Sequence, residues 1–218
     1  MNVLPALVQV FELAKTQQAD LYKTWVRISH LVGSRLPASL LSVSIQRDGE
    51  IDLVLRCLED EQAQRMAAGT EAGLFDMHYL NMLSTYWVGS MYETFRLLRQ
   101  RKLSGTSPVF NKIFSDLELL RMPLEKHELA KDKETLKEPL QMVRQPQSND
   151  ATDHYSYDPK DDRRAHIMPS ELSSRGSMTW HVIDLKAGTG RWVERRALSE
   201  RIVELWKDKQ PQPAQATP

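Results

Sequence analysis

Apolar residues recur at helical spacing from Leu4 to Leu31, which is the pattern of an amphipathic helix. Pro5 suits a first helical turn, and Gly33 and Pro37 end the pattern. We therefore predict one long helix, with a break near residues 16–18 as the alternative. Its apolar positions are Leu7, Val10, Phe11, Ala14, Leu21, Trp25 and Ile28.

The next segment, residues 39–59, changes to a period of two. Val43 and Ile45 alternate with serines, and Ile51 begins a second alternating run after Asp48-Gly49. Two alternating runs around an Asp-Gly pair are typical of a β-hairpin, so a hairpin is predicted here. The competing interpretation is a helix that ends at Gly49.

Helical spacing returns over residues 59–102, with a break predicted between Gly69 and Gly73. After a polar loop at residues 104–107, Pro108 begins another helix, which is expected to continue past Pro123 towards Leu136. Two long helices joined by a short loop form an antiparallel helical hairpin.

The last third of the chain begins with a polar stretch, residues 143–165, which we interpret as a linker. Alternating residues from Met178 to Asp184 and from Arg191 to Glu194 then predict a β-hairpin, followed by a short helix. The predicted fold class is α+β and predominantly α-helical. It consists of an antiparallel helical bundle with an inserted hairpin (1–142), the linker, a hairpin–helix appendage packing on the bundle (166–208) and a disordered tail (209–218).

Composition narrows the functional classes. The chain has 218 residues, with 29 Lys and Arg and 29 Asp and Glu, so its net charge is zero. A net charge of zero removes the usual argument for nucleic-acid binding, which is a large excess of basic residues, but it does not exclude a local basic patch. Cys57 is the single cysteine, which excludes a disulfide within the chain and a cysteine-based zinc site. With no signal-peptide pattern and no membrane-length apolar run, a cytoplasmic protein without a membrane partner is expected.

One stretch carries candidate chemistry, the sequence LLRMPLEKHE at residues 119–128. Proline within a helix removes a hydrogen bond and kinks or restarts the helix. Arg121 precedes this proline and His127 follows it, six residues further along the chain. An arginine can hold a phosphate through two hydrogen bonds, and a histidine can carry protons near neutral pH. Together they predict catalytic residues for metal-independent phosphodiester cleavage, while the alternative is a solvated charged helix face.

This stretch resembles the Arg-x5-His motif of the HEPN superfamily, the higher eukaryotes and prokaryotes nucleotide-binding domains. The resemblance covers at most residues 74–140. It implies a helical bundle that acts as a homodimer on RNA or a nucleotide, in a defence or toxin–antitoxin setting. Arg121 would hold the phosphate, His127 would carry the proton, and Glu93 and Arg96 would support them. Met122 and Pro123 depart from the family's pattern.

The C-terminal appendage combines guanidinium and indole groups, a composition suited to binding a protein partner or a phosphate. The candidate residues are Arg175, Trp180, Trp192 and Arg195. The rings of Tyr86, Trp87, Tyr92 and Phe95 are interpreted as core packing, with base stacking as the alternative.

Two classes of function follow from these patterns. The first is a HEPN-like protein that cleaves RNA or binds a nucleotide as a homodimer. The second is a non-enzymatic interaction or regulatory module that binds protein partners through its helices and its C-terminal hairpin. Neither requires a cofactor, and the spacing of His154, His166 and His181 among acidic residues matches no metal-ligand pattern.

Overall fold

In the computed structural model, which describes residues 2–36, 39–70, 73–104, 107–144 and 153–207, helices dominate and the strands lie in the last third of the chain. The helices are α1 (Val3–Gln17), α2 (Ala19–Gly33), α3 (Leu41–Ala67), α4 (Leu74–Gln100), α5 (Pro108–Arg121), the π-helix η1 (Met122–Lys126), α6 (Asp132–Thr135) and α7 (Arg195–Lys207). The strands are β1 (Leu140–Arg144), β2 (Asp153–Tyr157), β3 (Ser170–Leu172), β4 (Met178–Asp184) and β5 (Thr189–Glu194). The fold is therefore α+β and mostly helical, as predicted.

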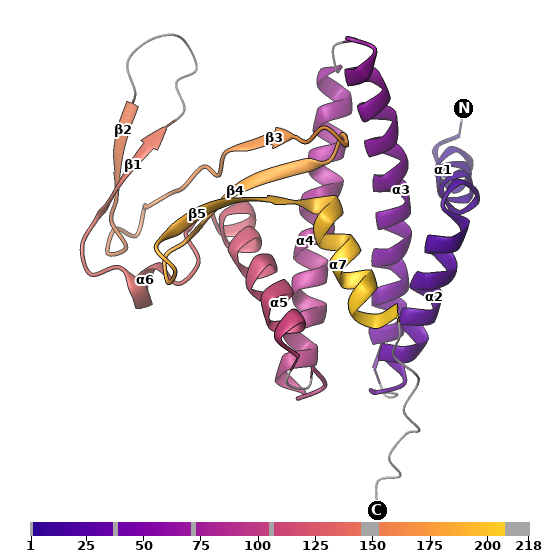
Figure 1. Ribbon diagram of the computed structural model, residues 1–218, viewed down its shortest axis with the longest axis horizontal. Coiled ribbons are helices and arrows are strands. Elements are labelled where there is room, and N and C mark those ends of the chain that lie inside the picture. The colour runs from indigo at the N-terminus through magenta and orange to yellow at the C-terminus, as the bar shows by residue number, and fades with distance from the viewer. Residues whose placement is uncertain (1, 37–38, 71–72, 105–106, 145–152, 208–218) are drawn as a thin grey trace, which may run out of the picture.

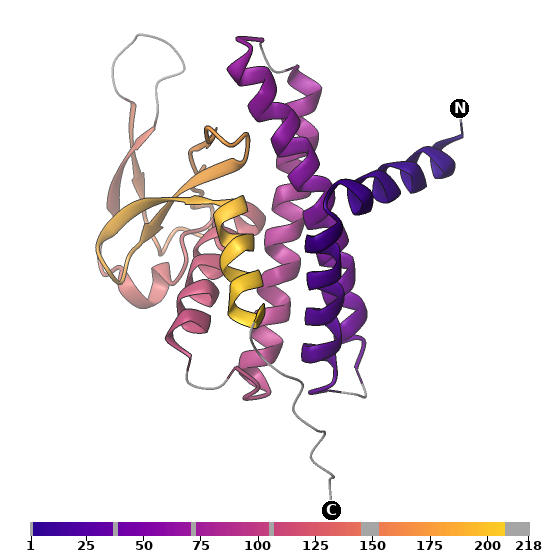
Figure 2. The same cartoon turned by 45° about the vertical axis from the view of Figure 1, so that its right-hand side comes forward.

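Five helices form the body. Each packs on the next in the order α2, α3, α4, α5 and α7, and α7 closes the arrangement by contacting α2 (Figure 1). Helix α1 crosses α3 and projects from the bundle, as Figure 2 shows most clearly. The three-stranded sheet, in the order β3–β4–β5, lies against α4 and α5, and β1 and β2 form a separate two-stranded sheet beyond it (Figure 1).

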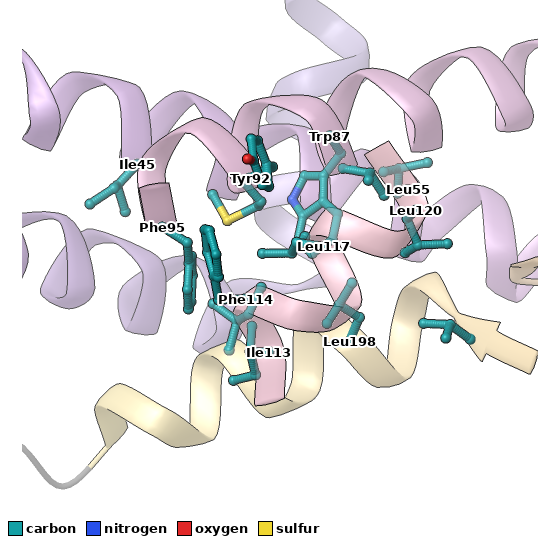
Figure 3. Close-up of a cluster of buried hydrophobic side chains, with 14 of the residues drawn as sticks. Ile45, Leu55, Trp87, Tyr92, Phe95, Ile113, Phe114, Leu117, Leu120 and Leu198 are labelled. Carbon is teal, nitrogen blue, oxygen red and sulfur yellow. The ribbon is translucent and has the colours of Figure 1, made fainter. Parts of the chain in front are cut away.

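Aromatic rings fill the centre of the bundle (Figure 3). The Trp87 side chain has no exposed surface, and the rings of Phe95 and Phe110 stack with their centroids 4.7 Å apart. Tyr92 stacks on Phe114 in the same way. The core interpretation of Trp87, Tyr92 and Phe95 is confirmed, whereas Tyr86 lies on the surface.

The hairpin predicted after the first helix is wrong, because residues 41–67 form the single continuous helix α3. Gly49 lies in the middle of this helix, where the Trp25 side chain packs directly on its backbone. A Cβ atom at position 49 would lie 2.6 Å from Trp25 Cγ. The glycine therefore marks a close approach of two helices rather than a turn.

The single N-terminal helix that was predicted is two helices, α1 and α2, with the break at Gln18 that was the alternative. Other local signals are confirmed. α3 and α4 are separated at the predicted glycines. Ser107 caps α5 by accepting a hydrogen bond from the Phe110 N–H at 3.3 Å, just before the proline that begins the helix. The C-terminal hairpin is confirmed, with Trp180 paired with Val193 across β4 and β5, and α7 is the predicted closing helix.

The polar stretch interpreted as a linker contains a strand. β2 pairs antiparallel with β1, and the Met142, Leu129 and Tyr157 side chains form a small second core beneath them. The predicted tail, residues 209–218, lies outside the described residues. Within the described ranges, no helix combines the length and the apolar character needed to cross a bilayer.

Candidate functional site

At the proline in LLRMPLEKHE the α-helix changes into one turn of π-helix, and the helix ends four residues later. At Met122 the chain passes from α5 into the π-helix η1, and the His127 N–H donates to the carbonyl oxygen of Pro123 at 3.1 Å. His127 then adopts a left-handed conformation, with φ of 57°, which terminates the helix. The predicted continuation towards Leu136 is therefore wrong, and only the short α6 follows. A π-turn is rare, and such turns are frequent at functional sites.

Arg121 lies among carboxylates on the surface between α4 and η1. Its Nε is 2.7 Å from Glu125 Oε2 and its Nη2 is 3.7 Å from Glu93 Oε1, while the guanidinium carbon lies 4.8 Å from the centre of the Tyr92 ring. Glu93 also pairs with Arg96 at 2.6 Å. The structure thus brings together three of the residues named in the sequence, Arg121, Glu93 and Arg96.

His127 is held by its backbone. Its carbonyl oxygen accepts a hydrogen bond from the His166 N–H at 2.7 Å, and its side chain is exposed. Within the part of the chain that the structure describes, the imidazole pairs with neither Arg121 nor Glu93. The two candidate catalytic groups therefore have no common partner.

Two surface cavities lie near this stretch, and neither is lined by Arg121 or His127. One has a volume of about 410 Å³ between α5 and the β4–β5 turn, and the other has about 360 Å³ beside Asp132 and Arg164. Both are bordered by Glu118 and Lys131, which form an ion pair at 2.7 Å. Their lining mixes charges of both signs, so they show no preference for an anion or a cation.

The candidate partner-binding residues of the C-terminal appendage divide into two pairs. Trp180 and Arg195 are buried in the core, with 1% and 0% of their surface exposed. Arg175 pairs with Glu194 and Glu200 at 2.5 and 2.8 Å, but its side chain remains partly exposed to solvent. Trp192 is 45% exposed. A role in partner binding stays a prediction for Arg175 and Trp192.

Arg195 belongs to a buried ionic network that the sequence patterns did not reveal. It donates to Asp52 and Glu59 on α3, both fully buried, and the Trp25 indole N–H donates to Asp52 at 2.9 Å. Burial raises the pKa of Asp52, but the charges of Arg195 and Arg56 and these hydrogen bonds outweigh it, so the pKa lies below its ordinary value. This network fastens α7 to the bundle.

The available signal for this network was the spacing of Asp52, Arg56 and Glu59. These residues follow one another at four and three positions, so they share one face of a helix. If residues 39–59 are interpreted as a hairpin, Asp52 and Arg56 lie on one face of a strand and Glu59 on the other, so the three residues no longer share one side.

His166 is buried between the two sheets. Its Nδ1 lies 2.9 Å from the Tyr155 hydroxyl, and its Nε2 has no hydrogen-bond partner among the residues that the structure describes. Burial, with a smaller contribution from His181, lowers the pKa of His166 to about 4, so the ring is neutral at pH 7. Among the described residues, no group of three or more His, Cys, Asp and Glu side chains could hold a metal ion.

The most unusual surface is on α1. Only Ala14 of this helix is buried, and much of the helix's apolar surface faces solvent. We call the α1 apolar face the set of large exposed side chains Val3 (83%), Leu4 (71%), Leu7 (51%), Val8 (52%), Val10 (47%) and Leu13 (55%). Several large exposed apolar side chains on one projecting helix are typical of an interaction site.

Comparisons with protein-family models, with curated proteins and with solved structures find no match to this chain. The function is therefore inferred from the geometry alone.

Proposed function

We propose that this protein is a non-enzymatic interaction module that forms a homodimer through α1. The observation that carries the proposal is the α1 apolar face. Full burial of a Val or Leu side chain stabilises by about 1.5–3 kcal/mol, and this helix leaves six such side chains about half exposed or more. A second protein surface that covers them would recover part of that free energy.

The base of α1 is fixed, whereas the rest of the helix is free to dock. Ala14 and Phe11 pack on the core, and Lys15 pairs with Glu50 of α3 at 3.2 Å. Beyond these contacts the helix extends away from α2 and α3 (Figure 2). A helix anchored at one end is presented in a defined direction, which lowers the entropy lost on association.

The chemistry of α1 suits a second copy of the same helix. Its ionisable side chains are Glu12 and Lys15, which are opposite in sign and pair with each other at 3.2 Å. Two copies related by a two-fold axis therefore meet without repulsion between like charges. Apolar residues at positions 3, 7 and 10 and at positions 4 and 8 recur at spacings of three and four, the rows by which helices pack on each other.

The test is the molar mass in solution, measured by light scattering or sedimentation over a range of concentrations. We expect about twice the chain mass of 25.1 kDa for the natural protein and a monomer for Leu4→Glu/Leu7→Glu. Both leucines are exposed, so the substitutions leave the fold intact. The matched control is Met82→Glu, which places a charge on an exposed apolar residue of α4 and is expected to remain dimeric. A monomeric natural protein, or a dimeric Leu4/Leu7 variant, contradicts the proposal.

RNA cleavage is a second candidate, favoured by the position of Glu93 and Arg96 beside Arg121. Charge weakens it, because a phosphate at Arg121 would also meet the carboxylates of Glu93 and Glu125. Helices α1 and α5 lie on opposite sides of the bundle in both views, so the two proposals can be tested separately (Figures 1 and 2).

The cleavage test incubates the protein with total RNA in EDTA, beside Arg121→Ala/His127→Ala. Cleavage by the natural protein alone supports catalysis. Intact RNA in both reactions, together with a dimer in solution, leaves the interaction module as the function.

A further inference from the structure

One end of the helical bundle is basic, although the chain as a whole has no net charge. The last turns of α2 and α4 and the first turns of α3 and α5 lie together at this end in both views (Figures 1 and 2). No Asp or Glu occurs in residues 21–47 or 94–115, which contain these turns. We call the basic end the set of cations Arg27, Arg35, Arg99, Arg101, Lys102 and Lys112, none of which forms an ion pair with another described residue.

Two of these cations are fixed by the fold and the others are free. The Arg35 guanidinium donates to the Leu103 carbonyl oxygen at 3.1 Å and lies over the Trp206 ring, and the Arg99 guanidinium lies over Phe114. Arg27, Arg101, Lys102 and Lys112 have exposed side chains. Glu204 of α7 lies two residues before Trp206, but it pairs with Lys207 at 3.4 Å, so the six cations of the basic end remain in excess. Such an excess of cations produces a positive potential that extends from the surface and attracts an anionic partner.

Aliphatic side chains project between these cations. Leu40 immediately precedes α3 and is 77% exposed, and Val43 in the first turn of α3 is 60% exposed. Val109, the second residue of α5, is 51% exposed. All three therefore stand where helices begin at the basic end, so apolar and cationic groups share one surface.

The geometry points to an anionic phospholipid surface as the partner of the basic end. Its cations would meet lipid phosphates, while Leu40, Val43 and Val109 enter the boundary between headgroups and acyl chains. This is a peripheral contact and requires no spanning helix, in contrast to the absence of a membrane partner expected from the sequence.

RNA fits the same charge less well. Binding of single strands uses exposed aromatic rings on which bases stack. At the basic end, however, Phe110 and Trp206 are buried, and the exposed rings of Tyr79, Tyr86 and Trp192 belong to other parts of the protein. Exposed aliphatic side chains do not contribute to the binding of a phosphate. They are required, together with cations, for insertion into a lipid surface.

The charge is tested by co-sedimentation with vesicles of phosphatidylcholine, with and without phosphatidylserine, at low and high salt. We expect salt-sensitive binding to the anionic vesicles only. Each Lys or Arg near such a surface strengthens binding about fivefold, so Arg101→Gln/Lys112→Gln is expected to weaken it about 25-fold. The matched control, Lys133→Gln/Lys160→Gln, removes two exposed, unpaired lysines elsewhere and is expected to bind as the natural protein does.

The apolar contribution is tested with Leu40→Ser/Val109→Ser. Serine is favoured at the N-cap position that Leu40 occupies, so this variant should fold, which a thermal melt checks. We expect it to lose most vesicle binding. The proposal is overturned if the natural protein does not bind anionic vesicles or binds neutral ones equally well. It is also overturned if Arg101→Gln/Lys112→Gln or Leu40→Ser/Val109→Ser binds as the natural protein does. Loss of vesicle binding by Leu4→Glu/Leu7→Glu overturns it as well. Tight binding of RNA without binding of vesicles assigns the basic end to nucleic acid instead.

Discussion

The guanidinium of Arg195 donates to both carboxylate oxygens of Glu59, at 2.7 and 2.6 Å, although the two residues lie 136 positions apart in the chain. Neither side chain has exposed surface. The Ser177 hydroxyl donates to the same carboxylate at 2.6 Å, so the β3–β4 turn and the first residue of α7 meet at one point on α3. This contact joins the C-terminal appendage to the bundle.

Replacement of Arg195 by Met should destabilise the protein by about 3–5 kcal/mol, because it leaves Glu59 buried without a partner charge and leaves Asp52 with Arg56 alone, at 3.6 Å. Urea unfolding followed by circular dichroism measures this loss. The control is Arg163→Met, whose side chain is 94% exposed and should change the unfolding midpoint little. Equal midpoints for the two variants would show that the network does not stabilise the fold.

Gly176 lets the β3–β4 turn approach α3. Its φ is 70°, and a Cβ atom there would lie 2.2 Å from the Glu59 carbonyl oxygen and 2.7 Å from the Ala63 nitrogen. Gly176→Ala should therefore cost about 2–5 kcal/mol, from backbone strain and from the displaced helix. Gly188 has a similar φ of 65° with open space around it, so Gly188→Ala should cost only about 1–2 kcal/mol. Thermal or urea unfolding of the Gly176→Ala and Gly188→Ala variants measures both losses of stability. Equal losses would contradict this account.

His166 should make the stability depend on pH between about 6.5 and 4. Its pKa is about 4 in the folded protein and near 6.5 when unfolded, so the unfolded chain binds the proton first as the pH falls. The free energy of unfolding should decrease through this window by about 3 kcal/mol and level off below it. His166→Gln should remove this slope, which urea titrations at several pH values would measure. An unchanged slope would assign the effect to other groups.

Tyr157 connects the second core to α6. Its hydroxyl donates to Asp132 Oδ2 at 2.7 Å and accepts from the Leu129 N–H at 3.0 Å, and burial with the Asp132 hydrogen bond raises its pKa to about 12. Tyr157→Phe should cost about 1–3 kcal/mol, because it leaves a buried N–H without an acceptor. Hydrogen exchange at Leu129 should accelerate. Tyr79→Phe, at an exposed ring, serves as the control, and identical exchange in both variants would refute the role of the hydroxyl.

Local chemistry explains which elements could be predicted from the sequence. Three signals act between residues that are close in the sequence, and each was read correctly. They are the capping serine before Pro108, the glycines between α3 and α4, and the alternation in β4 and β5. The error at residues 39–59 has a different origin. There Asp48, Asp52, Arg56 and Glu59 occupy buried positions of α3, so charged residues interrupt the apolar stripe by which a buried helix is recognised.

The candidate sites also divide into those that the sequence predicted and those that depend on the tertiary structure. The proximity of Glu93 and Arg96 to Arg121 was expected from the family resemblance alone, and the adjacent helices α4 and α5 bring these residues close. The exposure of the α1 apolar face was not, because Leu7 and Val10 have the spacing of core residues and only the direction in which α1 leaves the bundle keeps them in solvent. The basic end was equally hidden, since it combines two segments about seventy residues apart in the sequence.

The sequence by itself determined a mostly helical chain with zero net charge and a C-terminal hairpin, because periodicity, capping residues and turn residues act over a few positions. The tertiary structure decided which apolar faces find a partner and which buried charges are neutralised, and where cations gather. These properties depend on contacts between residues far apart in the chain, such as Arg195 and Glu59. No local sequence pattern predicts such a contact.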